Sequence, residues 1–493
     1  MSALEEIRGA RIRKLNDESV GEAYPSASAR THTLADLERD FSSLHTKKTT
    51  LCVAGRVRTI RGHGGSIFFD LDDGTGAMQA YIQKHLIGEE SFRSFENVVD
   101  IGDFLEISGI PFFTKKREKT ISVSSWRMLA KSIRPLPEKW HGLQDVEERF
   151  RQRPLDLLMN PTVRARFEAR SKLLRSLRAF FEKEGFQEVE TPMLQPIPGG
   201  ALARPFITHH NALDADFYLR VAPELYLKRL LVGGLPRVFE IGKNFRNEGI
   251  DALHNPEFTE LEAYAAFEDA QGFMALIERL FEKATKEVTG KHIILFNGNE
   301  IVIKNGFRRM SFEEALARYA LLPNFFEQSR DALVVAAKQM GVLIDKNASH
   351  GKIGDEIFRK VARPHLIPPT FITHHPLDIS PLAKESKEKE GRLACPAGRA
   401  ERFQLIVGGV ELVNGYSELN DPLEQRERFE AQEKLRAGGE EEVTRLDENY
   451  LEALEYGMPP AAGLGIGVDR LAQLLTDTHN IKEVILFPTL RPR

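Results

Sequence analysis

Polar and apolar residues alternate in short runs between residues 50 and 130. Alternation with a period of two is typical of strands that have one buried face, and Asp73-Gly74 is typical of a hairpin turn. Because neighbours in a strand face opposite sides, we expect Phe69 in the core and Phe68 on the other face. About five such strands in this stretch predict a small β-barrel or sandwich.

A helical period replaces this alternation further along the chain. Leu173, Leu177 and Phe181 lie on one helical stripe, and Gly185 follows where the helix is expected to end. Strand-like and helix-like segments then alternate, which predicts a large α+β domain. The expected order is an N-terminal helical extension (1–45), a barrel (46–135), a proline-containing linker (136–163) and the α+β domain (164–493), with a helical insertion at about 311–362.

Composition is ordinary for a globular protein, since 42% of the 493 residues are hydrophobic and 28% are charged. No apolar stretch has the length of a membrane helix, and the first residues lack the apolar core of a secretory signal, so we expect no membrane association. The two cysteines, Cys52 and Cys395, cannot form a disulfide framework, which favours a cytoplasmic location.

Charge is distributed unevenly along the chain. Taken alone, the formal net charge of −4 argues against a nucleic-acid partner. However, residues 46–65 contain five Lys or Arg and no acid, and residues 111–139 contain eight Lys or Arg and two acids. The predicted barrel is therefore basic, whereas residues 430–455 are acidic, so the charge of each domain is more informative than the sum.

Residues 239–269 combine an arginine and a glutamate with a later aromatic residue. Arg246 and Glu248 follow one apolar strand, and Phe258 lies at the start of a second. Arginine can hold a phosphate with two hydrogen bonds, a carboxylate can accept one from an exocyclic amine, and phenylalanine can stack on a base. The pattern suits a nucleotide, although a hairpin with surface ion pairs would contain the same residue types.

Three other segments carry polar residues in apolar surroundings. Glu411, Asn414 and Glu418 interrupt a strand-like run, and buried carboxylates need a partner such as a divalent cation; the alternative is surface acids beside a turn. Arg470 lies at a strand–helix junction, where it could face an anion. Glu224 follows a proline near the start of a helix, where a carboxylate complements the helix dipole.

Together these segments resemble the class II aminoacyl-tRNA synthetases, and within them the lysyl-tRNA synthetase family of the bacterial and eukaryotic type. EGFQEVETPML resembles motif 1 of the class, FRNEG…HNPEF resembles motif 2, and GLGIGVDRL resembles motif 3. ARPFITHHNALDADFYLRVAPELYLKRLLVGG, ISPLAK and NGYSELNDP resemble the lysine enzymes. The resemblance covers essentially the whole chain. It implies an OB-fold anticodon-binding domain, a class II antiparallel catalytic domain and a homodimer built through motif 1.

The same resemblance implies a reaction and its site. A lysine–tRNA ligase uses ATP and Mg²⁺ to convert L-lysine to lysyl-adenylate and then transfers the lysyl group to the 3′ end of lysine tRNA. The catalytic residues implied are Arg246 at the α-phosphate, Glu248 at the adenine amine, and Arg470 beside the adenine and the γ-phosphate. The implied ATP-binding set is Arg246, Glu248, His254, Asn255, Phe258, Glu411 and Arg470. The implied lysine-binding set is Gly200, Glu224, Glu262, Tyr264, Asn414, Tyr416, Glu418 and Gly465, with Glu418 meeting the lysine ammonium.

The resemblance also implies metal ligands and anticodon contacts. Glu411 and Glu418 resemble carboxylates that hold or border Mg²⁺. Gln404 stands where the family usually has a metal-binding glutamate, so we expect weaker metal binding, because glutamine lacks the charge. The implied anticodon-binding set is Arg61, Phe68, Gln79 and Glu118, with Phe68 stacking on a base.

Three alternatives to this function were weighed. A paralogue that lysylates a protein would lack the anticodon domain. A non-catalytic RNA-binding protein would explain Gln404, but Arg246, Glu248, Glu411 and Arg470 are all present. The aspartate and asparagine enzymes share the architecture, but the APELYLK and SELNDP stretches favour lysine.

Overall fold

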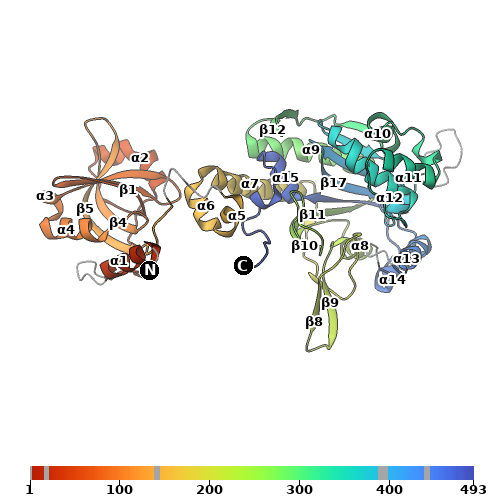
Figure 1. Ribbon diagram of the computed structural model, residues 1–493, viewed down its shortest axis with the longest axis horizontal. Coiled ribbons are helices and arrows are strands. Elements are labelled where there is room, and N and C mark those ends of the chain that lie inside the picture. The colour runs from red at the N-terminus through yellow and green to blue at the C-terminus, as the bar shows by residue number, and fades with distance from the viewer. Residues whose placement is uncertain (1–2, 16–21, 138–144, 387–397, 438–444) are drawn as a thin grey trace. The chain divides into compact units, whose positions relative to one another are not determined.

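The computed structural model describes residues 3–15, 22–137, 145–386, 398–437 and 445–493 (Figure 1). These form two compact units, Met1–Gln144 and Asp145–Arg493. Cys395 and part of the predicted linker lie outside the described residues. Within the ranges described, we find no helix of the length and apolarity needed to cross a membrane.

The first unit is a closed barrel with the strand order β1-β2-β3-β5-β4. Its strands are β1 (Leu51–His63), β2 (Ser66–Asp72), β3 (Ala77–Gln83), β4 (Phe104–Phe113) and β5 (Lys119–Ala130). Burial alternates along β2, with Phe69 in the core and Phe68 half-exposed, as the alternation predicts. Phe68 therefore lies on the face of β2 that points away from the barrel core.

Four helices accompany the barrel: α1 (Ala3–Leu15), α2 (Leu34–Thr46), α3 (Lys84–Ile87) and α4 (Glu89–Val98). Thr33 caps α2, because its hydroxyl accepts a hydrogen bond from the Asp36 backbone and the Asp36 carboxylate accepts one in return. Leu34, Leu37 and Phe41 of α2 are buried in the barrel's hydrophobic core. The predicted helical extension therefore includes a helix that completes this core.

The second unit contains an eight-stranded sheet in the order β14-β15-β16-β17-β18-β11-β10-β6. The strands are β6 (Gln187–Glu188), β10 (Arg237–Phe245), β11 (Glu257–Ala266), β14 (Arg308–Ser311), β15 (Thr370–Thr373), β16 (Arg402–Val407), β17 (Val410–Ser417) and β18 (Ala461–Gly467). Pairing is antiparallel from β15 to β10 and parallel only at the two edge pairs. This is the antiparallel catalytic sheet that the resemblance implies.

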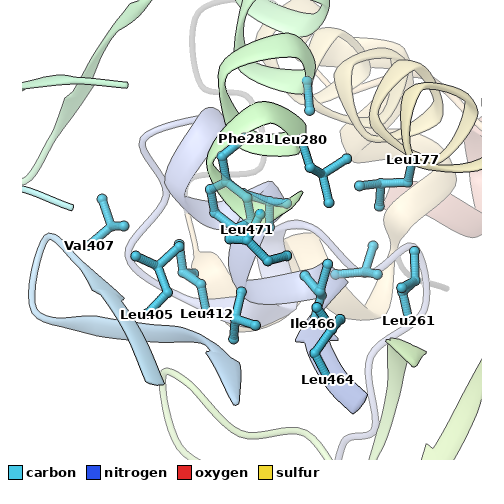
Figure 2. Close-up of a cluster of buried hydrophobic side chains, with 14 of the residues drawn as sticks. Leu177, Leu261, Leu280, Phe281, Leu405, Val407, Leu412, Leu464, Ile466 and Leu471 are labelled. Atoms are coloured by element: carbon cyan, nitrogen blue, oxygen red, sulfur yellow. The ribbon is translucent and has the colours of Figure 1, made fainter. Parts of the chain in front are cut away.

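Three helices pack against this sheet: α7 (Pro161–Lys183), α9 (Ala270–Thr289) and α15 (Val468–Leu475). Figure 2 shows Leu177 of α7, Phe281 of α9 and Leu471 of α15 beside leucines of the strands. The apolar stripe of α7 is buried here, and the chain leaves the helix at Gly185 with a φ of +82° that suits glycine.

The predicted linker (136–163) contains two short helices, α5 (Val146–Arg151) and α6 (Arg153–Met159). The Arg153 side chain is fully buried and pairs with Asp156 at 2.7 Å. It also donates to the carbonyl groups of Lys482, Ile485 and Leu486. This arginine fixes α6 to the C-terminal segment, so the second unit begins earlier than the proline pattern suggests.

The segment predicted as an insertion contains α10 (Phe312–Tyr319), α11 (Arg330–Gln339) and α12 (His350–Ile357), which share a core of their own. Ile372 of β15 and Ile406 of β16 join that core and attach it to the sheet. The remaining elements of the unit are β7 (Leu194–Gln195), β8 (Ile207–His210), β9 (Ala215–Leu219), α8 (Glu224–Val232), β12 (Ile293–Phe296), β13 (Asn299–Val302), α13 (Pro422–Ala437) and α14 (Glu448–Glu455).

Candidate active site

A pocket of about 350 Å³ opens at the neighbouring strands β11, β17 and β18. Most residues expected to bind ATP or lysine line it, namely Gly200, Glu224, Arg246, Glu248, His254, Asn255, Phe258, Glu262, Tyr264, Glu411, Asn414, Tyr416, Gly465 and Arg470. Glu418 and Gln404 are buried and are not among the lining residues. Segments more than 200 residues apart in sequence thus contribute to one site.

One half of the pocket is formed by the β10–β11 loop. Arg246 follows β10, and its backbone N–H donates to the Pro256 carbonyl at 2.9 Å, which joins the two ends of the loop. The guanidinium carbon lies 4.9 Å from the ring centre of Phe258. The Nε atom of Arg246 is buried with no hydrogen-bond partner among the described residues, so this cation can still bind a ligand.

Arg470 enters the same half from the first turn of α15. Strand β18 runs directly into this helix, and the Asp469 carboxylate accepts a hydrogen bond from the Thr259 backbone at 2.8 Å and pairs with Arg170. These contacts fix the helix start beside β11. Arg470 Nη2 lies 3.0 Å from His254 Nε2, so the loop after β10 and the first turn of α15 meet at this point.

The other half of the pocket is strongly acidic. Glu224, Glu262 and Glu418 are each at most 5% exposed. The Tyr264 hydroxyl donates to Glu262 at 2.8 Å, and the Tyr416 hydroxyl donates to Glu224 at 2.6 Å. Burial raises the pKa of both tyrosines well above its usual range, and the Glu224 carboxylate adds to this, so the phenols remain protonated donors.

Among the described residues, Lys228 is the cation that pairs with two of these acids. Lys228 Nζ donates to Glu224 at 2.6 Å and forms an ion pair with Glu418. Burial, followed by the carboxylates of Glu260 and Glu224, raises the pKa of Glu262 well above its usual range. No motif singles out Lys228 in the sequence, although its position four residues after Glu224 in a helix is the spacing of an ion pair.

Small residues open this half of the pocket. A side chain at Gly463 would overlap Glu418 Oε1 and the Tyr264 ring, and one at Gly200, where φ is +87°, would press on Glu224. Gly465 lies beside Glu260. The Oε1 atom of Glu418 is buried without a hydrogen-bond partner among the described residues. This oxygen adjoins Gly463, which lines the pocket.

Asn414 is oriented by a residue that the sequence analysis did not single out. Arg402 Nε donates to the side-chain oxygen of Asn414 at 2.8 Å, and Arg402 Nη1 donates to Ile379 and Ser380 at 3.1 Å. With its oxygen held in this way, the Asn414 amide is left with its N–H groups for a ligand.

The three residues expected to bind Mg²⁺ have different surroundings. Glu411 lines the pocket, with 27% of its side chain exposed. Gln404 pairs with Asn414 in register but is 4% exposed, and Glu418 is seven residues beyond Glu411 and engages Lys228. In the described part of the chain we find no group of three or more acidic, His or Cys side chains suited to a metal. Glu411 fits as a carboxylate ligand beside phosphates, whereas one oxygen of Glu418 is engaged by Lys228.

The barrel carries a row of aromatic rings on its half-exposed face. Phe68 stacks on Tyr81 with 4.3 Å between ring centres, and Phe112 lies 6.0 Å beyond Tyr81. The sequence analysis named Phe68 alone. Because Tyr81 is the register partner of Phe68, pairing of the two strands would have predicted the second ring.

The other residues expected at the anticodon surround this row. Arg61 is the register partner of Phe68 on β1, and 63% of its side chain is exposed. The Gln79 carbonyl accepts a hydrogen bond from Thr120 at 2.9 Å, which leaves the amide N–H groups for a base. Glu118 is exposed between β4 and β5.

Comparison with known proteins agrees with both units. Residues 145–491 match the family described as tRNA synthetases class II (D, K and N), and residues 51–129 match the OB-fold nucleic acid binding domain. The predicted fold class, an α+β chain with an OB-fold barrel and a class II synthetase domain, is confirmed.

The chain is similar to curated lysine–tRNA ligases over its whole length. The ligase of Pelotomaculum thermopropionicum is 46% identical over 495 residues, covering 100% of this chain and 96% of the relative. That of Carboxydothermus hydrogenoformans is 45% identical and covers 99% of each chain, and that of Oceanobacillus iheyensis is 45% identical and covers 94% of each. The chain therefore belongs to the class II tRNA synthetases and, within them, to the lysine–tRNA ligase family.

Proposed function

We propose that the chain ligates L-lysine to lysine tRNA in two steps. The lysine carboxylate attacks the α-phosphorus of ATP, which forms lysyl-adenylate and releases pyrophosphate. A ribose hydroxyl at the 3′ end of the tRNA then attacks the lysyl carbonyl carbon, and AMP leaves. The reaction needs no side-chain nucleophile, so the protein contributes positioning and charge stabilisation.

The buried carboxylate of Glu418 is the observation that carries the choice of lysine. Its Oε1 atom lacks a hydrogen-bond partner among the described residues and adjoins Gly463 and Tyr264. A long apolar stem between aromatic rings, ending in an ammonium group, suits this arrangement. An amino acid without that ammonium would leave the Oε1 atom of this carboxylate without a partner, and this strongly disfavours binding.

The nucleotide occupies the other half of the pocket in this proposal. Arg246 binds the α-phosphate, where it offsets the repulsion between the approaching lysine carboxylate and the phosphate. Phe258 and Arg470 hold the adenine between them, Glu248 accepts from its amine, and His254 and Asn255 lie near the phosphates. The free Nε of Arg246 and the closeness of Arg470 to His254 support these roles.

Mg²⁺, when bound, supplies positive charge to the phosphates. Glu411 is the residue proposed to hold it, with Gln404 contributing at most a neutral carbonyl oxygen. The tRNA anticodon is proposed to bind the Phe68 row of the basic barrel.

We further infer a homodimer in the cytoplasm. Met193 and Leu194 are adjacent in the segment that resembles motif 1 and are each 46% exposed, so they offer apolar surface to a partner.

Amino-acid-dependent ATP–pyrophosphate exchange tests the proposal directly. Exchange is expected with lysine and not with aspartate or asparagine, followed by charging of lysine tRNA. Exchange with aspartate in place of lysine would overturn the substrate. No exchange with any amino acid, at any Mg²⁺ concentration, would instead favour a non-catalytic RNA-binding protein.

A further inference from the structure

Lys228 is a cation buried at the acidic end of the pocket. Its side chain is 0% exposed, and its Nζ lies 2.6 Å from Glu224 Oε1 and is paired with Glu418 Oε2. The rings of Tyr416 and Tyr450 lie 5.5 and 6.0 Å from the ammonium. A site proposed to recognise a lysine ammonium thus already contains one, on the same carboxylates.

The two ammonium groups need not compete, because Glu418 has two oxygens. Oε2 faces Lys228, whereas Oε1 adjoins Gly463 and has no hydrogen-bond partner among the described residues. One oxygen therefore serves the resident cation and the other remains for a ligand. Lys228 also fixes Glu224, which accepts from the Tyr416 hydroxyl as well.

Without this cation the carboxylates would repel each other in a site that excludes water. The groups around the Lys228 ammonium are Glu224 on α8, Tyr416 and Glu418 at the end of β17, and Tyr450 on α14. Burial raises the pKa of Glu418 to about 8, Lys228 opposes this rise and Glu224 adds to it. Burial alone would lower the pKa of Lys228, but Glu224 and Glu418 outweigh it and raise that pKa, so Lys228 stays charged.

Strand β11 adds a further acidic side chain to the group around Lys228. Glu262 and Tyr264 lie beside Glu224, and the Tyr264 hydroxyl donates to Glu262. The cluster therefore holds more carboxylates than cations, which leaves room for the charge of a cationic ligand.

We propose that Lys228 is a positioning residue for substrate lysine: it pairs with Oε2 of Glu418 and so turns this carboxylate with Oε1 toward the incoming ammonium. This inference rests on the proposed lysine ligation and adds to it a residue that need not touch the substrate. Lys228 acts by charge in this account, so a neutral side chain of similar length cannot replace it.

Two substitutions separate a role of charge from a role of packing. Lys228→Met keeps the length and removes the charge, whereas Lys228→Arg keeps the charge and adds bulk. In ATP–pyrophosphate exchange, Lys228→Met is expected to lower kcat/KM for lysine at least about tenfold, with the KM for ATP changed less than about threefold. Lys228→Arg should retain more activity than Lys228→Met, with the KM for lysine closer to the wild-type value.

Lys131 of the barrel offers a matched control. It is also a lysine with a 0% exposed side chain between two carboxylates, with its Nζ 2.7 Å from Asp103 and 2.5 Å from Asp100. Lys131→Met tests the loss of a buried lysine without touching the pocket, and its KM for lysine is expected to stay at the wild-type value.

Each outcome bears on the proposal. Lysine kinetics that are unchanged in Lys228→Met, or that are worse in Lys228→Arg than in Lys228→Met, would overturn it and indicate packing. Loss of folding in both Lys228 variants, with Lys131→Met folded, would also overturn it, because Lys228 would then serve stability. Absence of lysine-dependent exchange in the wild type would instead refute the proposed function.

Discussion

Replacing Glu418 with glutamine removes one negative charge and almost no volume from the lysine pocket. Glu418 is 1% exposed, and its two oxygens face Lys228 and Gly463. The glutamine amide cannot form an ion pair with the substrate ammonium, and it leaves Lys228 with one carboxylate fewer. Both changes disfavour a second cation in the pocket.

The size of the effect follows from the burial of this group. A hydrogen bond to a buried charge contributes about 2–4 kcal/mol, which corresponds to an approximately 30- to 1000-fold lower kcat/KM for lysine. The KM for ATP should change little, because Glu418 is not in the ATP half. Steady-state exchange with lysine varied at saturating ATP, and then with ATP varied, separates the two effects.

Glu106→Gln is the matched control for this substitution. Glu106 is a buried glutamate of the barrel that pairs with Arg127 at 2.8 Å, so its loss tests the general cost of removing such a charge. Less than a threefold loss of kcat/KM for lysine in Glu418→Gln, or an equal loss for lysine and ATP, would refute the proposed contact.

Three further predictions concern pH, metal and tRNA. Because Glu418 must be ionised to hold the ammonium and its pKa is raised to about 8, kcat/KM for lysine should rise with pH and level off above about pH 8; a flat profile from about pH 6 to about pH 9 would contradict this. Gln404→Glu should lower the Mg²⁺ concentration that gives half-maximal exchange, since it adds a carboxylate near Asn414; an unchanged value would refute the expected weakness. Phe68→Ala should raise the KM for tRNA about 5- to 150-fold, as expected for loss of one stacked base, and leave exchange unchanged; slower exchange would indicate a structural role.

Regular periods in the sequence predicted the elements that carry the site. The stripe of α7 and the alternation of β2 depend on neighbours in the sequence, and both the helix and the outward position of Phe68 appear as expected. The family motifs then indicated which segments meet. Fourteen of the residues expected to bind ATP or lysine line one pocket.

The alternation of a regular strand could not predict which side chains of β17 line the pocket. Glu411 and Asn414 are three residues apart, which would place them on opposite faces of a regular strand. The register between β16 and β17 shifts between Leu405 and Ile406, so that Leu412 has no partner of its own and both polar side chains line the pocket. A bulge of this kind depends on the partner strand and leaves no local signal.

Lys228 and Arg402 were missed for a related reason. Each acts through a side chain from another segment, Lys228 through Glu418 and Arg402 through Asn414. Residue type and spacing identify groups that bind a ligand directly more readily than groups that hold those residues in place. The start of the second unit was difficult to predict for a similar reason. The prolines of residues 145–163 indicated a linker, whereas the buried Arg153 side chain shows that these residues pack within the unit.

Charging of lysine tRNA by the purified full-length chain tests the central claim most directly. The account predicts ATP-dependent attachment of lysine to the 3′ end of lysine tRNA, with aspartate and asparagine not attached to the same tRNA. Attachment of another amino acid in place of lysine, or lysine-dependent exchange without any charging of tRNA, would contradict it.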